Sequence, residues 1–172
     1  MRSAGPILLM AALMTGGASW AGQPPPKLDF AIEDQFGELH TDEDCGSAVV
    51  ILLGGGRKGV TFISEWVPPL HEALAGELAA GEVCSVGFAH LKGVPFFVKK
   101  KVVNGFSKDP SEWTLLDWKG HIARSWGAEK DAANIYIFDR AGRLVFQESL
   151  QETNEQQFDR IVAATRSAVG GQ

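Results

Sequence analysis

Cysteine is scarce in this chain: only Cys45 and Cys84 occur among its 172 residues. No second ligand stands near either one at the spacing of a zinc site. The histidines are equally scattered, at His40, His71, His90 and His121. The sequence therefore predicts no metal and no cofactor.

The chain also lacks an excess of positive charge. It holds 16 Lys and Arg residues against 21 Asp and Glu residues, a formal net charge of −5. Nucleic acids and anionic membranes attract basic proteins. The net charge gives no electrostatic case for either one, so the expected partner is an unknown protein or a small-molecule ligand.

Long apolar runs are missing beyond the N-terminus, where residues 1–21 predict a secretory signal peptide. Arg2 supplies the positive start, Ile7 to Met14 the apolar core, and Ser19-Trp20-Ala21 a small-x-small cleavage site. The segment is too short to span a bilayer well, although an uncleaved anchor is the alternative. No stable membrane span is expected after cleavage.

Cleavage would leave a Pro-rich spacer, residues 22–27, and one folded domain, residues 28–172. A domain of this length has room for a core of its own. The signal peptide implies a periplasmic or secreted location. Such compartments are oxidising, so the two cysteines can pair there.

A buried strand followed by glycines and a helix forms the centre of the sequence. Val49 to Leu53 are all large aliphatics, as in a strand covered on both faces. Three glycines follow, and then apolar residues recur every fourth position on one helical face, at Trp66, Leu70, Leu74 and Leu78. Open α/β sheets carry their chemistry at such a strand-to-helix junction. We therefore expect any active site between Gly54 and Pro69.

Further segments flank this centre. A helix over 93–106 is expected to lie on the sheet with its three lysines, 99–101, facing water; a docking patch for an acidic partner is the alternative. A last helix shows capping-box spacing at Thr153 and Gln156 and a stop at Gly170-Gly171. The other predicted elements are a hairpin of 28–32 with 38–41, strands 83–88 and 113–117, a short helix 121–126, and a hairpin of 135–139 with 144–148.

Several short motifs carry a resemblance to a known family. They are Leu28-Asp29-Phe30, the turn Asp34 to Gly37, Pro69 in the first helix, Gly56-Arg57, and the stretch Ile135 to Val145. In this order the chain resembles the thioredoxin-like superfamily, in its redoxin and thiol-specific antioxidant branch. It is most similar there to small periplasmic members of unassigned role. The resemblance implies a single α/β domain with a mixed central sheet, helices on both faces and an N-terminal β-hairpin.

The chain departs from that family at the redox site. Counting back from Pro69, the positions of the family's active-site residues hold Thr61 and Ser64. A serine hydroxyl gives neither a thiolate nor a sulfenic acid, and Ser64 is more simply interpreted as a helix N-cap. The family's cis-proline falls near Ala133, where a trans bond is expected. Both departures predict lost thiol catalysis.

The two cysteines are predicted to form a structural disulfide. Each stands at the entry of a buried strand, and a crossover helix makes those strands parallel, so both lie at one end of the sheet. Neighbouring strands would bring Cys45 and Cys84 within disulfide range. Two free thiols or a catalytic pair are the alternatives.

The glycine-rich segment after the central strand is a weak candidate for anion binding. Gly55, Gly56 and Arg57 stand before a helix and are the expected contacts. No Gly-Lys-Ser/Thr follows, so the segment is not a P-loop. We prefer turn geometry as the reason for its glycines. The sequence thus predicts an exported binding or interaction module without thiol catalysis, and its alternative is a thiol-disulfide oxidoreductase or peroxiredoxin-type enzyme that uses Cys45 and Cys84.

Overall fold

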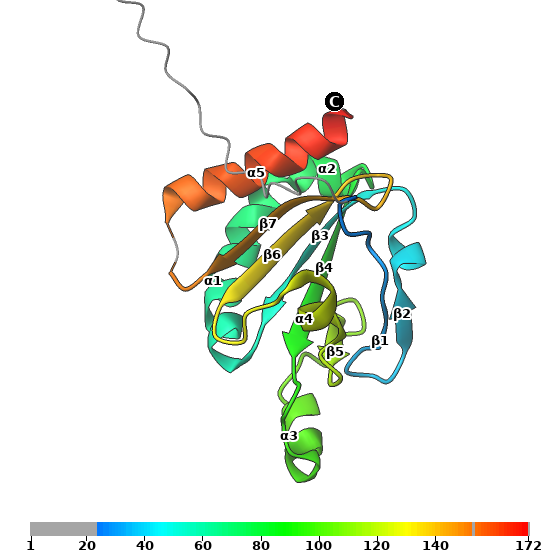
Figure 1. Cartoon of the computed structure of the whole chain (residues 1–172), viewed down its shortest axis with the longest axis vertical. Helices are drawn as coiled ribbons and strands as arrows, with labels where there is room; N and C mark the ends of the chain where they lie inside the picture. The colour runs from blue at the N-terminus through cyan, green and yellow to red at the C-terminus, as the bar shows by residue number, and fades with distance from the viewer. Residues whose placement is uncertain (1–23, 153, 172) are drawn as a thin grey trace, which may run out of the picture.

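A mixed five-stranded sheet forms the centre of the molecule (Figure 1). The computed structural model describes residues 24–152 and 154–171, so the predicted signal peptide and Thr153 lie outside the described residues. The strand order is β5-β4-β3-β6-β7. Their bounds are β3 (Val49–Gly55), β4 (Val83–His90), β5 (Thr114–Asp117), β6 (Ala133–Phe138) and β7 (Leu144–Leu150). Strands β3, β4 and β5 are parallel to one another. Strand β6 pairs antiparallel with β3, and β7 pairs antiparallel with β6.

The predicted N-terminal hairpin stands beside this sheet as a small sheet of its own. Its strands are β1 (Ala31–Glu33) and β2 (Leu39–Thr41), paired antiparallel. A 3₁₀ turn, η1 (Asp42–Cys45), leads from it into β3. The hairpin, the mixed sheet and the buried central strand confirm the predicted fold class.

Helices cover both faces of the sheet. Every residue of β3 is therefore buried, and its side chains alternate between two cores. On one face, Val49, Ile51 and Leu53 pack with α1 (Arg57–Ala73) and α5 (Glu155–Gly170), next to α2 (Ala75–Ala79). On the other face, β3 contributes Val50 and Leu52, which pack with α4 (His121–Trp126) and the N-terminal segment. The predicted helical face is confirmed at Trp66, Leu70 and Leu74, which are buried. Leu78 is half-buried and belongs to α2, because α1 ends at Ala73.

The prediction for residues 93–106 was wrong. This segment forms η2 (Phe96–Val98) and α3 (Lys99–Val103), which project beyond the end of β4 rather than covering the sheet (Figure 1). The reason is the register of β5, whose four residues pair only with Gly87 to His90 at the end of β4. After β4 the chain therefore returns only a short way along that strand before β5 begins, and no long crossover helix is needed.

The cap of the last helix also differs from the prediction. Asn154 is the N-cap of α5, and its side chain accepts a hydrogen bond from the Gln157 amide at 2.9 Å. The stop is confirmed, with Gly171 in the left-handed conformation at φ 69°. Among the described helices, none has the length and hydropathy that a membrane span requires.

Candidate functional site

The carboxyl ends of β3, β4 and β5 meet at one edge of the sheet, next to the start of α1. Strand β3 ends at Gly55, Gly56 is the N-cap, and α1 begins at Arg57. The loop before β6 lies against this junction, because the Gly56 amide donates to the Lys130 carbonyl at 3.1 Å. Lys58 and Asp131 form an exposed ion pair at 3.5 Å across the same contact. The loop backbone thus takes the N-cap amide, one of the donors with which a helix N-terminus would stabilise a thiolate.

Close packing explains the glycines of this junction, and the interpretation as turn geometry was wrong. Gly54 and Gly55 continue the strand, and none of Gly54 to Gly59 has positive φ. A Cβ at Gly59 would lie 2.7 Å from the Ala132 carbonyl carbon and closer still to its oxygen. Added Cβ atoms at Gly55 and Gly56 would meet the carbonyl oxygens of Ala132 and Lys130. Glycine is required here because the loop backbone comes so near.

The predicted anion contacts at this junction differ in whether they could still bind an anion. Gly55 belongs to the β3–β4 ladder, and the Gly56 amide is already bonded. Arg57 is exposed. Arg57 as an anion contact stays a prediction.

Asn134 holds the loop in place from inside the sheet. Its side chain is fully buried, and its amide nitrogen donates to the carbonyls of Glu129 at 2.8 Å and Ala132 at 3.1 Å. Its oxygen accepts from the Glu129 amide at 2.7 Å and the Ser149 hydroxyl at 2.9 Å. No peptide bond in the described chain is cis, and that includes the bonds around Ala133. The Asn134 side chain, bonded through both its nitrogen and its oxygen, thus holds this loop in position. The family's cis-proline was expected at the end of the same loop.

Thr61 and Ser64 lie inside α1 rather than at its start. Thr61 is more than a full turn from Arg57, and Ser64 is about two turns from it. The Ser64 hydroxyl donates to the Thr61 carbonyl at 2.7 Å. The interpretation of Ser64 as an N-cap was therefore wrong, because Gly56 has that position. Neither hydroxyl sits where a helix N-terminus would lower its pKa.

Cys45 and Cys84 form the predicted disulfide, with Cα atoms 5.7 Å apart. Strands β3 and β4 are parallel neighbours, and Cys84 pairs in register with Val50. From there β3 runs five more residues to Gly55, a distance of about 17 Å at 3.3 Å per residue. The bridge therefore lies at the far end of the sheet from the α1 N-terminus.

His90 is the buried polar residue of the carboxyl edge that sequence reasoning missed. It ends β4, stands beside Asp117 in register, and is only 8% exposed. Its Nδ1 has no hydrogen-bond partner among the described residues. Asp117 itself caps α4, accepting from the amides of His121 at 2.7 Å and Ile122 at 3.0 Å. The sequence held part of the signal, since Asp117 ends a predicted strand, but His90 lies two residues beyond the predicted end of its strand at Phe88.

Burial lowers the pKa of His90 below the usual imidazole value; Asp117 opposes this shift, while Lys130 and Lys92 add to it. Burial lowers the pKa of His71 in the same direction. The folded protein therefore favours the neutral form of both imidazoles. Their contribution to stability is fully present above a pH of about 6.5 and is lost as the pH falls below that value.

We expect His90→Gln to weaken this pH dependence. The wild type should lose thermal stability between about pH 6.5 and about pH 5 because unfolding lets His90 and His71, whose pKa values are lowered in the folded state, take up protons. The variant has one such histidine fewer, so its melting temperature should fall less over the same interval. Calorimetric scans at each pH measure the difference. Parallel curves for the two proteins would contradict the assignment to His90.

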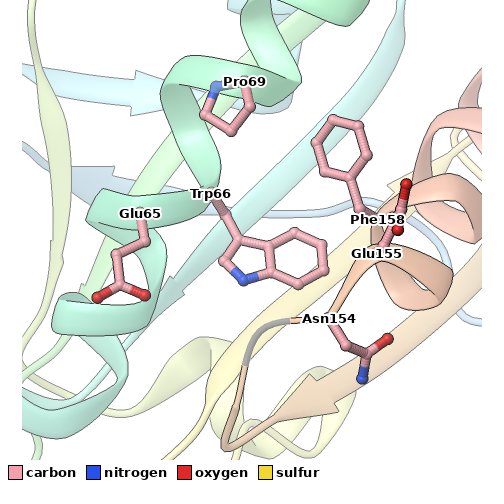
Figure 2. A pocket seen from close by; sticks show the side chains of 6 residues that line it. All are labelled: Glu65, Trp66, Pro69, Asn154, Glu155 and Phe158. Carbon is pink, nitrogen blue, oxygen red and sulfur yellow. The ribbon is translucent and has the colours of Figure 1, made fainter.

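A second candidate region is a groove of about 360 Å³ between α1 and α5 (Figure 2). The side chains of Trp66 and Phe158 line it side by side, with ring centroids 5.9 Å apart. Pro69 adds to the apolar wall, and Glu65 and Glu155 bring carboxylates to the rim. The Trp66 indole Nε1 is buried and has no partner in the described part of the chain.

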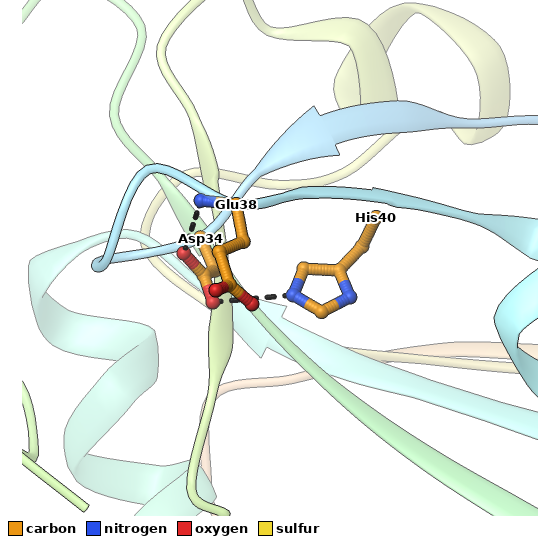
Figure 3. Close-up of side chains that lie close together, drawn as sticks. All are labelled: Asp34, Glu38 and His40. Atoms are coloured by element: carbon orange, nitrogen blue, oxygen red, sulfur yellow. Dashed lines mark hydrogen bonds and ion pairs between the residues drawn. The ribbon is translucent and has the colours of Figure 1, made fainter. Parts of the chain in front are cut away.

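A third cluster joins Asp34, Glu38 and His40 at the turn of the N-terminal hairpin (Figure 3). The buried Asp34 carboxylate accepts from the amides of Phe36 at 2.7 Å and Glu38 at 3.0 Å, and lies 3.1 Å from His40 Nε2. Burial would raise the pKa of Asp34, but these hydrogen bonds and the charge of His40 lower it below its usual value. His40 also stacks on Trp113 at 3.9 Å. The ligand types suit a divalent cation, yet closing the hairpin turn already accounts for the bonds of the Asp34 carboxylate.

Comparisons with known proteins bear on the fold. No family model matches the chain, and no curated protein matches it. Solved structures do match at low identity. A protein assigned as the thiol:disulfide interchange protein DsbE of Chlorobium tepidum is 18% identical with a TM-score of 0.62, over 86% of this chain and 99% of that one. BsSco, of the Sco family of cytochrome c oxidase assembly proteins, is 14% identical with a TM-score of 0.60, over 87% and 98%.

The exposed lipoprotein thioredoxin Etrx1 of Streptococcus pneumoniae is 16% identical with a TM-score of 0.60, over 81% of this chain and 98% of that one. The chain has a thioredoxin-like fold. The resemblance carried by its sequence motifs is confirmed at this level. The names of these neighbours include thiol-disulfide proteins, and at such identities the likeness extends to the fold alone.

Proposed function

We propose that this protein is an exported thioredoxin-like binding module without thiol catalysis. The observation that carries the proposal is the α1 N-terminus, where no sulfur stands and the N-cap amide is bonded to the loop backbone. Catalytic thiols of this fold need a sulfur at that helix start, where the dipole stabilises a thiolate. Here Gly56 is the N-cap, and its amide is bonded to the Lys130 carbonyl.

The placement of the disulfide supports the same proposal. Cys45 is buried, Cys84 is half-buried, and the pair lies about 17 Å from the α1 N-terminus. Nothing in the arrangement of β3 and β4 places a helix N-terminus beside either sulfur. A bridge that joins two core strands suits a structural role better than a redox couple.

Export is supported by the segment composition of residues 1–21 and by the disulfide, since paired cysteines persist in oxidising compartments. One of the similar structures is itself named an exposed lipoprotein. A periplasmic or secreted location therefore belongs to the proposal.

Thiol reactivity tests the proposal directly. Protein recovered from the native envelope should have the intact mass of a chain that begins at Gly22. It should take up no alkylating reagent before reduction and two equivalents after reduction under denaturing conditions. The reduced protein should leave the rate of insulin-disulfide reduction by dithiothreitol unchanged, because neither thiol stands where its pKa would be lowered.

The alternative oxidoreductase predicts different results. Accelerated insulin reduction that disappears in Cys84→Ala would establish a catalytic pair and overturn the proposed function. Alkylation before reduction would mean free thiols. An intact mass that includes residues 1–21 would remove the export claim and leave the enzymatic result unaffected.

A further inference from the structure

The connection between β4 and β5 runs over residues 91–113, and its first part, residues 91–108, forms an arm that extends past the edge of the sheet (Figure 1). Two phenylalanines lie on it, Phe96 at 87% exposure and Phe97 at 74%. Their rings stand edge to face with centroids 6.0 Å apart. Two adjacent aromatic side chains left almost wholly in water form an apolar protrusion of the kind that marks an interaction surface.

Positive charge is concentrated on the same arm. Its 18 residues include no Asp or Glu, and they carry five of the 16 basic residues of the chain, namely Lys92, Lys99, Lys100, Lys101 and Lys108. The arm therefore has a net charge of +5, and the rest of the chain has −10. Asp109 and Glu112 follow in the same connection, so residues 91–113 together keep a net charge of +3. The net charge of −5 hides this separation. An argument from the whole-chain charge does not apply to the arm.

The arm is anchored to the body at both ends. At its return, the buried Gln35 side chain donates to the Glu112 carbonyl at 2.8 Å and accepts from the Thr114 amide at 2.8 Å. At α3, the Lys99 ammonium lies 4.8 Å from the centroid of the Trp118 ring. These contacts hold the phenylalanines in a fixed place relative to the sheet.

Positive charge continues from the arm onto the body. Lys99 lines a cavity of about 420 Å³ whose wall also includes Lys119 and Arg124. Two acidic residues, Glu33 and Asp117, belong to the same wall, and Asp117 is committed to capping α4. The surface at the base of the arm thus keeps an excess of cations.

We propose that this arm docks the protein on an anionic lipid bilayer. Phe96 and Phe97 enter the interfacial region, Lys100 and Lys101 lie against lipid phosphates, and Lys99 stays at the Trp118 ring and adds its charge to the same surface. Interfacial helices join apolar residues to lysines in this way, and long lysine side chains reach headgroups while their stems stay in contact with apolar surface. The proposal goes beyond the function proposed above and does not depend on the chemistry of the cysteines.

A bilayer fits the arm better than an acidic protein does. Lysine is depleted at protein–protein interfaces, whereas basic clusters next to apolar side chains are typical of proteins that bind anionic lipids. A protruding pair of phenyl rings also needs a matching pocket on a protein, while a bilayer receives them without one. The acidic remainder of the chain would then be turned away from the lipid surface.

Vesicle co-sedimentation of the full chain tests the proposal. Wild-type protein should bind phosphatidylcholine vesicles that contain phosphatidylglycerol, and it should bind pure phosphatidylcholine vesicles much less. The triple variant Lys99→Gln/Lys100→Gln/Lys101→Gln should bind the anionic vesicles roughly 100-fold more weakly at low salt, from roughly fivefold per lysine. Phe96→Ser/Phe97→Ser should weaken binding about tenfold or more at low and high salt alike.

Matched variants isolate the arm. Lys27→Gln/Lys58→Gln/Lys130→Gln removes the same charge from exposed positions elsewhere, and Leu39→Ser removes an apolar side chain that is 64% exposed. Both controls should bind like the wild type. Residues 1–21 are identical in all of these proteins, so they cannot produce a difference between them.

Three results would overturn the proposal. The first is that the wild type does not bind anionic vesicles at low salt. The second is that the arm variants bind as well as the controls. The third is that an acidic polypeptide such as polyglutamate binds the arm while vesicles do not, which would assign the surface to an acidic protein partner. Melting temperatures equal to the wild type confirm that the variants are folded, as expected for exposed residues.

Discussion

Removing the disulfide is expected to lower the melting temperature by roughly 8 to 16 °C. The bridge joins residues 39 positions apart, and on the chain-entropy model such a loop contributes about 4 kcal/mol to the free energy of unfolding. A protein of this size loses about 2 to 4 °C per kcal/mol. The double variant Cys45→Ala/Cys84→Ala measures the effect by thermal unfolding under oxidising conditions.

Two further measurements show whether the bridge is only structural. Wild-type protein kept in reductant should unfold at nearly the temperature of the double variant, because both lack the same cross-link. Reductant should leave the double variant itself unchanged. If the double variant melted like the oxidised wild type, the bridge would add nothing to stability and the structural assignment would be wrong.

Much of the fold could be predicted because its strongest signals are local. Three of its elements are specified without reference to distant residues. They are the strand in the apolar run Val49 to Leu53, the helix in which apolar residues recur at every fourth position from Trp66 to Leu74, and the helix His121–Trp126. The disulfide could be predicted as well, because a helical crossover makes the two strands parallel and so puts both cysteines at the same end of the sheet.

The rest depends on contacts between distant segments. The arm was mistaken for a covering helix because nothing local shows that β5 pairs with only the last four residues of β4. The helix start was misplaced for the same kind of reason: the count back from Pro69 led to Thr61 and Ser64, while the observed helix begins at Arg57. Three glycines in a row suggest a turn, and only the nearby loop backbone reveals the packing constraint.

The buried polar residues of the carboxyl edge illustrate the same limit. Asn134 follows two alanines and precedes an apolar strand, so its sequence context suggests a loop end rather than a saturated core amide. Its partners are Gly54, Glu129, Ala132 and Ser149, and the bonds to Gly54 and Ser149 join β6 to separate strands. A close reading of strand ends could have brought His90 and Asp117 together, but not the bonds of Asn134.

Gly59→Ala is expected to destabilise the protein by about 2 to 3 kcal/mol or more, the opposite of its usual effect in a helix. Alanine at an unconstrained helical position stabilises by up to about 1 kcal/mol, because glycine loses more backbone entropy on folding. At Gly59 the added Cβ would lie 2.7 Å from the Ala132 carbonyl carbon. That atom is backbone, held by the bonds of Asn134, so the loop or the helix must shift.

Gly76 provides the matched control within the same molecule. It lies in α2, and a Cβ added there would meet nothing within 4 Å. Gly76→Ala should therefore raise the free energy of unfolding by up to about 1 kcal/mol, measured by urea denaturation in parallel with Gly59→Ala. Opposite signs for the two variants would confirm that the loop backbone packs against α1 as tightly as the structure has it. If Gly59→Ala were as stable as Gly76→Ala, the junction would have room for a side chain, and the tight contact between the loop backbone and the α1 N-terminus that supports the absence of thiol catalysis would fail with it.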